Sequence, residues 1–151
     1  MEDPKITWYV KQANTDEQYE ETEDYYAGTY TPSHHIDVLI QLWNNRFGLE
    51  DVSALSNFYI TISFEHIEDM SLLDYCSICM NHSDVLTLKK TGHKAVLEFP
   101  RKVTLSGTKN DGQTQNNEDH YIDLEFSFDA AGEKLKENDL KSMYFQIVQL
   151  G

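Results

Sequence analysis

The sequence predicts an all-β protein, a two-sheet antiparallel β-sandwich of jelly-roll or immunoglobulin-like type, with about eight strands, short helical turns and an extended N-terminal arm. Apolar residues alternate with polar ones along most of the chain from residue 36 onward, which is typical of strands with one buried and one solvated face. Residues that favour turns separate these runs. The 151 residues are enough for one domain, and every apolar pattern of helical period is short.

Eight runs fit the strand pattern. The clearest is 120–128, in which every second residue from Ile122 to Phe128 is apolar and the residues between them are mostly polar. The other runs are 36–43, 58–65, 75–80, 85–89, 94–99, 102–105 and 144–150.

The connections between these runs agree with a sandwich. Residues 90–93 form a tight hairpin loop around Gly92, and residues 106–117 form a long polar loop with a turn at Asp111-Gly112. Short helical turns are expected over 49–55 and 67–73, and again just before Lys141, where Asn138 or Asp139 can act as the cap.

Residues 1–35 are predicted to form an arm, and residues 36–151 the sandwich domain. The arm segment holds eight acidic residues and two lysines, and five of the nine tyrosines. Its stretch 16–26 contains no Val, Ile, Leu or Met, so we expect it to bury little surface by itself. Tyr19, Tyr25 and Tyr26 suit a segment that orders on a partner. The alternative is a solvated tail whose tyrosines cover the body of the same molecule.

The charge limits the classes of partner. With 26 acidic and 12 basic residues the formal net charge is −14, which disfavours nonspecific binding to nucleic acid or to anionic membranes because both depend on Lys and Arg. An acidic mimic or inhibitor of a basic host protein stays open. The N-terminus lacks the basic start and apolar run of a signal peptide, and no stretch is long enough to span a bilayer, so we expect synthesis in a cytoplasm.

The candidate chemical motifs are weak. Cys76 and Cys79 are spaced as Cys-x-x-Cys with His82 nearby, but they lie in a predicted strand, where thiols three residues apart point to opposite faces. His34 and His35 are adjacent, which makes them poor co-ligands. The acidic loops 65–74 and 110–119 leave a bound cation open, without EF-hand spacing. No known catalytic motif is present, and we expect no catalytic residue, no cofactor, no metal and no small-molecule substrate.

Residues 43–48 combine two aromatic residues with an arginine at a strand end. Trp43 and Arg46 are residue types that anchor protein interfaces. Two alternatives are open: Trp43 caps one end of the core, or Trp43 and Trp8 stack on sugars in a carbohydrate-binding module.

Five of the twelve basic residues fall on one predicted hairpin and its exit: Lys89, Lys90, Lys94, Arg101 and Lys102. Their sign is opposite to that of the N-terminal arm. We therefore expect the arm of one copy to lie on the hairpin of the next copy, in a head-to-tail contact. The alternative is that these lysines only protect an exposed strand edge from aggregation.

Four segments occur in a characteristic order along the chain. They are Leu42-Trp43-Asn44-Asn45-Arg46-Phe47-Gly48, then Glu50-Asp51-Val52, then 105–107 with 110–112, and last Asp139-Leu140-Lys141. This order resembles structural proteins of tailed-bacteriophage virions: capsid decoration (auxiliary), neck (head-tail) or tail proteins, those of crAss-like phages among them. The resemblance covers about residues 36–149 and carries no functional residue over.

The resemblance implies a noncatalytic structural protein of the virion, made in the host cytoplasm, whose partners are other virion proteins and copies of itself. Nucleic acid and membrane are not expected as partners. The alternative function is a monomeric binding module for carbohydrate or a host protein, or the acidic mimic. The partner-binding residues predicted on these grounds are Tyr19, Tyr25, Tyr26, Trp43, Arg46, Lys89, Lys90, Lys94, Arg101 and Lys102.

Overall fold

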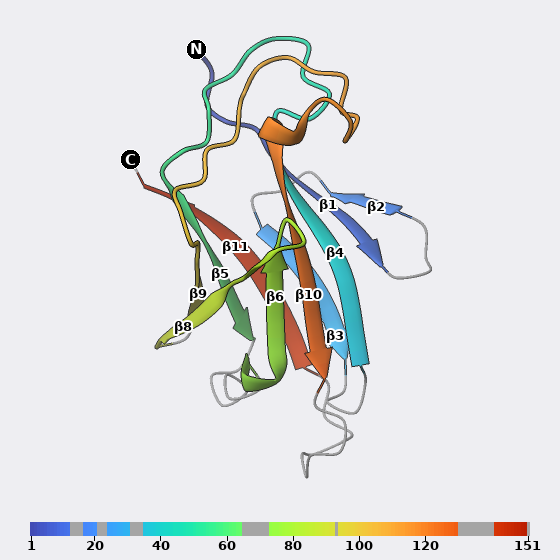
Figure 1. Ribbon diagram of the computed structural model, residues 1–151, viewed down its shortest axis with the longest axis vertical. Helices are drawn as coiled ribbons and strands as arrows, with labels where there is room; N and C mark the ends of the chain where they lie inside the picture. Colours follow the sequence, from blue (N-terminus) through green and yellow to red (C-terminus); the bar gives the residue numbers. More distant parts are fainter. Residues whose placement is uncertain are drawn as a thin grey trace.

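Two antiparallel sheets pack face to face in the computed structural model, which describes residues 1–12, 17–20, 24–30, 35–64, 73–92, 94–129 and 141–150 (Figure 1). The six-stranded sheet has the order β2 (Glu17–Glu20), β1 (Ile6–Gln12), β4 (His35–Asn44), β10 (Tyr121–Asp129), β6 (Cys76–Met80), β7 (Asp84–Val85). The five-stranded sheet has the order β3 (Asp24–Tyr30), β11 (Lys141–Gln149), β5 (Phe58–Phe64), β9 (Lys94–Glu98), β8 (Thr87–Thr91). The predicted two-sheet antiparallel sandwich is confirmed.

The core lies between the two sheets, and in β10 the alternation of apolar and polar residues matches the buried and solvated faces of the strand. Ile122, Leu124, Phe126 and Phe128 are all buried, whereas the residues between them are half-buried or exposed. Across the interface the Phe126 ring meets the Phe145 ring of β11 edge-on, with centroids 5.4 Å apart. One apolar face on each sheet thus supplies the hydrophobic contact that holds the sandwich together.

The described part of residues 1–35 is not an arm outside the sandwich. Strand β1 pairs with β4 over seven residues, and its Trp8 side chain is fully buried in the core beside Phe145. Strand β2 pairs with β1 at one sheet edge, and β3 pairs with β11 in the other sheet. Burial of one large aromatic side chain stabilises by several kcal/mol, so β1 belongs to the body. The boundary at residue 35 is corrected on this ground.

Some predicted elements differ in detail. Residues 85–89 divide into β7 and β8 at Leu86, because the chain crosses there from one sheet to the other while the Leu86 amide still donates to the Ile78 carbonyl (2.9 Å). Residues 102–105 form no strand, and only Leu105 bridges to Leu55. Strand β11 begins at Lys141, before the predicted 144–150.

The helical turn expected over 49–55 does not form. The amides of Val52 and Leu55 instead donate to the carbonyls of Gly107 and Leu105, at 2.8 and 2.9 Å. A single isolated turn has little stability of its own, so these contacts decide the conformation. A 3-10 turn, η2, spans Glu118–His120, and residues 73–75 are also in 3-10 conformation. Residues 67–72 and 138–140, where the other two turns were expected, lie outside the described residues. No described helix is long and apolar enough to cross a membrane.

Candidate interaction surfaces

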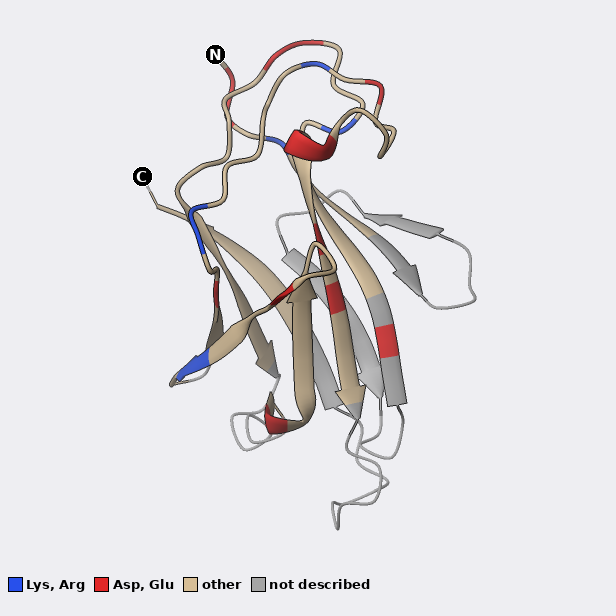
Figure 2. Ribbon diagram, in the orientation of Figure 1, with Lys and Arg blue, Asp and Glu red and all other residues tan. Residues whose placement is uncertain are grey.

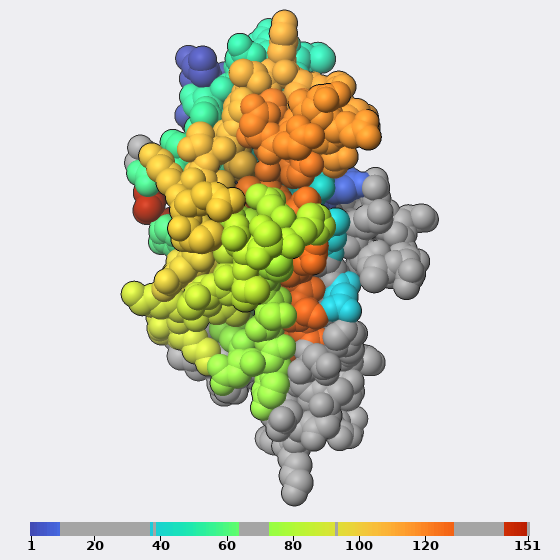
Figure 3. Space-filling view, viewed as in Figure 1, coloured from blue at the N-terminus to red at the C-terminus, as the bar shows by residue number. Residues whose placement is uncertain are grey.

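The loops at one end of the sandwich are hydrogen-bonded to one another, and we call them the loop end, defined as residues 1–5, 45–57 and 105–120 (top of Figure 1). Figure 3 shows the teal and orange loops packed directly against each other. Both segments follow or precede the central strands β4 and β10. The residues that carry the resemblance in 42–52 and in 105–112 are therefore neighbours in space.

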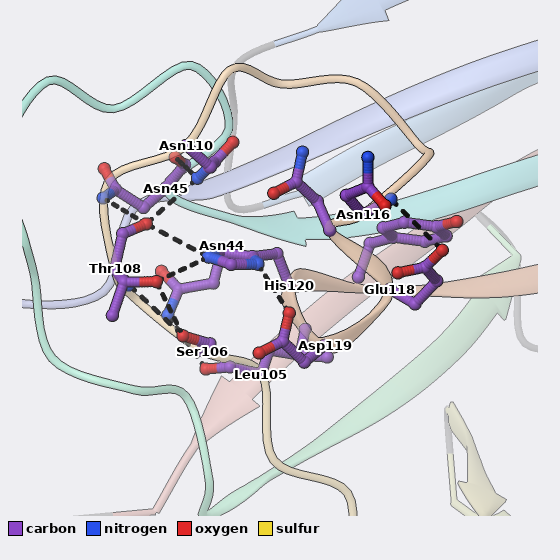
Figure 4. A network of polar contacts seen from close by, with 12 residues as sticks. Asn44, Asn45, Leu105, Ser106, Thr108, Asn110, Asn116, Glu118, Asp119 and His120 are labelled. Carbon is purple, nitrogen blue, oxygen red and sulfur yellow. Dashed lines mark hydrogen bonds and ion pairs between the residues drawn. The ribbon is translucent and has the colours of Figure 1, made fainter.

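Two buried asparagines at the end of β4 tie the loop end together (Figure 4). Asn44 is fully buried; its Oδ1 accepts from the Lys5 amide (2.9 Å), and its Nδ2 donates to the carbonyls of Ser53 (3.0 Å) and Leu105 (3.2 Å). The Nδ2 of Asn45 donates to the carbonyls of Glu50 and Gly107, both at 2.8 Å. The Leu105 and Gly107 carbonyls also accept from the amides of Leu55 and Val52, so the asparagines add further hydrogen bonds between the same loop segments.

Asn110 fixes the turn that follows Asn45. Its Nδ2 donates to the Asn45 carbonyl (2.8 Å), and its Oδ1 accepts from the amides of Phe47 (3.2 Å) and Gly112 (2.9 Å). Asn45 and Phe47 have φ values of 58° and 61°, which for a residue as bulky as Phe is a strained conformation that neighbouring contacts must hold in place. The turn presents Phe47, 48 % exposed, and Leu49, 90 % exposed, to solvent.

Arg46 lies in a second cluster, on the outer face of the six-stranded sheet. Its guanidinium lies over the rings of Tyr9, Phe47 and Trp43, with centroids at 4.1, 4.8 and 5.0 Å, and its Nε donates to the Gly112 carbonyl (3.0 Å). These contacts combine cation–π attraction with a hydrogen bond. They hold Arg46 in a fixed position beside the exposed Phe47.

Trp43 is not available to a ligand. It is fully buried, stacks on Tyr121 with centroids 4.5 Å apart, and donates from Nε1 to the Gln41 side chain (3.0 Å). Trp8 is also fully buried. Sugar stacking on these two indoles is therefore contradicted, and so is direct partner contact by Trp43, which instead packs behind Arg46. The Tyr121 ring on which Trp43 stacks has a raised phenol pKa; burial is the larger cause, and the carboxylates of Asp123 and Glu118 add to it.

The second part of the loop end is braced by individual polar pairs. The buried His120 ring contacts the Asp119 carboxylate through Nδ1 (2.9 Å) and the Thr108 hydroxyl through Nε2 (2.8 Å). The Gln113 amide and the Asn117 side chain donate to Asp111, and these bonds lower the pKa of its carboxyl. Among the described residues no three His, Cys, Asp or Glu side chains are grouped so that they can hold a metal ion.

The five basic residues predicted to form a patch all have exposed side chains on or just after the β8–β9 hairpin (Figure 2). Lys90 pairs with Asp74 (2.6 Å) and Arg101 with Asp84 (3.4 Å). Lys89, Lys90 and Lys94 lie at the tip of the hairpin, whereas Arg101 and Lys102 follow the opposite end of β9, so the structure does not bring the five together in one patch. Strand β8 ends its sheet, so Lys89 and Lys90 do lie at a sheet edge.

The three tyrosines proposed for partner binding lie in strands at sheet edges, Tyr19 in β2 and Tyr25 and Tyr26 in β3. The structure describes their backbones alone. Tyr19 is opposite Tyr9, Tyr25 is opposite Phe145 and Tyr26 is opposite Tyr144.

The Cys-x-x-Cys pair has the surroundings of structural thiols. The two cysteines are not joined in a disulfide, and both lie in β6. Burial, with a smaller effect of Asp74, raises the pKa of the Cys76 thiol to about 12, so the reactive thiolate is scarce at neutral pH. His82 is engaged on the sheet surface, where it contacts the carboxylates of Glu125 and Asp123. His34 lies outside the described residues, and His35 opens β4.

Comparison of the chain with protein-family models, with curated proteins and with solved structures finds no match. The surfaces described above therefore carry the functional argument. Arg46 and the basic hairpin are among the residues predicted from the sequence, whereas Leu49 and Asn110 are not among the partner-binding residues predicted there. The consecutive asparagines 44 and 45 directly after an apolar strand were the available signal, because such amides often satisfy loop backbone groups.

Proposed function

We propose that the protein is a noncatalytic structural component of a phage virion that binds another virion protein through its loop end. The observation that carries this proposal is the pair of apolar side chains, Phe47 and Leu49, held exposed on a strained turn. Strain of this kind persists only where the surroundings enforce it, and it is characteristic of functional sites.

The held turn suits binding because its geometry is fixed before the partner arrives. Asn110 and Gly112 hold Phe47 from one side, and Arg46 packs on its ring. Preorganised anchors lose little conformational entropy when they enter a pocket, so more of the contact energy contributes to affinity. The resemblance to virion proteins supports the same role, since most of the segments that carry it, within 45–52 and 105–112, belong to this surface.

The charge of the loop end indicates the kind of partner. The surface contains seven acidic residues and three basic ones, and Glu50 and Asp51, which directly follow Leu49, are exposed. The proposed partner surface is accordingly an apolar pocket with a basic rim.

The test is association with particles. Antibody detection of the chain on density-gradient-purified particles of the phage that encodes it is expected to be positive. Replacement of the solvent-exposed Leu49 in L49D is expected to lower the particle-bound amount at least about tenfold, as for loss of an interface hot spot. F47A is a second variant at the same surface. V85S is the matched control, because Val85 is an exposed apolar residue (79 %) on β7, away from the loop end. Absence of the chain from particles, or an L49D variant that binds like V85S, would overturn the proposal.

A further inference from the structure

Strand β8 leaves one side of the five-stranded sheet without a neighbouring strand in the described part of the chain. It pairs with β9 from Thr87↔Glu98 to Thr91↔Lys94, and no strand follows it in the sheet order. In an antiparallel ladder alternate residues direct their N–H and C=O groups away from the partner strand. Strand β8 therefore offers backbone groups to an incoming strand, and its residues are exposed except for the half-buried Leu88.

The charge of this edge is local and positive. Lys89 and Lys94 are exposed and form no ion pair with any described carboxylate, while Lys90 pairs with Asp74 in the turn before β6. The chain as a whole has a net charge of −14. Two copies therefore repel one another over most approaches, and the β8 edge is a region where an acidic surface is attracted.

The same chain provides an edge of opposite sign. Strand β2 ends the six-stranded sheet, and among the described strands it pairs with β1 alone, from Trp8↔Glu20 to Lys11↔Glu17. Its sequence is Glu-Gln-Tyr-Glu, and the stretch 16–24 holds six acidic residues and no basic one. The acidic segment expected to act as a free arm is thus, in its described part, an edge strand.

We propose that β8 of one copy pairs with β2 of a second copy, so that a sheet continues from one molecule into the next. The contact joins two different surfaces, so it is head-to-tail and builds a chain or a closed ring. Strand addition supplies backbone hydrogen bonds, and the unlike charges select the partner edge. Because the strands have only four and five residues, each contact is weak alone and gains strength when many copies assemble together.

This contact goes beyond the proposed attachment through the loop end, because it uses the sheet edges and a second copy as partner. The contact depends on the proposed function only in that neighbouring copies are expected to meet on the surface of a particle. The two fail separately: self-association is measured with the purified chain, and attachment is measured on particles with L49D.

The experiment is sedimentation velocity of the purified full-length chain at low salt, about 20 mM, and at about 500 mM, where screening is strong. We expect species heavier than the 17.5 kDa monomer at low salt and a loss of association by at least about tenfold at high salt. K89E/K94E and E17K/E20K are each expected to be monomeric. An equimolar mixture of the two variants is expected to associate again, because each reversed edge then meets an edge of opposite charge.

K5E/K109E is the matched control, since it makes the same change in charge at exposed lysines of the loop end. It is expected to associate like the unmodified chain. A monomeric unmodified chain at low salt would overturn the proposal and assign the lysines to protection of the edge. Association of either edge variant at the original strength, a mixture that stays monomeric, or equal loss in the control would also overturn it.

Discussion

Replacement of Asn44 by Ala tests whether the buried amide holds the loop end in place. The change removes three hydrogen bonds, one from the Lys5 amide and two to the carbonyls of Ser53 and Leu105. Asn44 is 0 % exposed, so the bonds of its side chain are lost inside the protein, although the Leu105 carbonyl still accepts from the Leu55 amide. At about 1 kcal/mol for each lost bond, we expect a loss of about 3 kcal/mol in the free energy of unfolding.

The assay is urea unfolding followed by the emission of the two buried tryptophans. With a slope of about 2 kcal/mol per M for a chain of this size, the midpoint is expected to fall by about 1.5 M. N57A is the control, because the exposed Asn57 side chain makes one bond, to the Leu150 carbonyl (2.6 Å); we expect about 0.5 kcal/mol there.

A third variant, N44D, sharpens the result. It keeps the size and the acceptor for the Lys5 amide but turns an oxygen toward two carbonyl oxygens and adds a buried charge. We expect it to be at least as destabilised as N44A at neutral pH. The reasoning is refuted if N44A shifts the midpoint no more than N57A does.

Three further predictions concern single groups. G107A is expected to lose about 3 kcal/mol by urea unfolding because its Cβ would overlap the Val52 carbonyl, whereas G92A, with φ +63° and open space, is expected to lose only about 1 kcal/mol; equal losses would contradict this. The folded-state pKa of Asp111 lies below its unfolded value of about 3.9, so its contribution to stability is complete above about pH 4 and is lost as the pH falls through the folded pKa. D111N is therefore expected to reduce the loss of unfolding free energy at acid pH. An unchanged dependence of the unfolding free energy on pH in this range would argue against the prediction. With a pKa of about 12, the Cys76 thiol in the C79S variant is expected to react with a thiol reagent at pH 8 roughly a thousandfold more slowly than an unfolded cysteine, and a comparable rate would show an accessible thiolate.

The sheets were predictable where one face of a strand meets the core and the other meets solvent. Strand β10 is the example, since its polar residues lie on the outer face and leave the period of two visible in the sequence. Strand β1 carries the same signal in Ile6, Trp8 and Val10, but it was hidden when the charge of residues 1–35 was considered as a whole. A local acidic stretch says little about a strand ten residues away, and a single buried Trp8 is enough to place that strand in the core.

The loop end was not predictable, because its conformation depends on contacts between distant parts of the chain. Asn44 bonds to Leu105, Asn45 to Gly107 and Asn110 to Asn45, across 61 to 65 residues of sequence. No local period or turn rule encodes such pairs. The composition of 43–48 predicts an interface anchor, which stays a prediction; of its two aromatic residues, Trp43 is buried and Phe47 is half exposed.

The two proposed contacts differ in how salt should affect them, and this follows from their construction. At the loop end the exposed groups that enter a pocket are apolar, and the acids Glu50 and Asp51 only follow them in the chain, so binding should weaken modestly as salt is raised. At the β8 edge the selective term is attraction between lysines and glutamates at the molecular surface, which salt screens strongly. A salt series on particles therefore separates the contacts: at high salt, copies bound through Phe47 and Leu49 stay attached singly, while contacts between neighbouring copies dissociate. Loss of all copies at once would instead assign attachment itself to the charged edges.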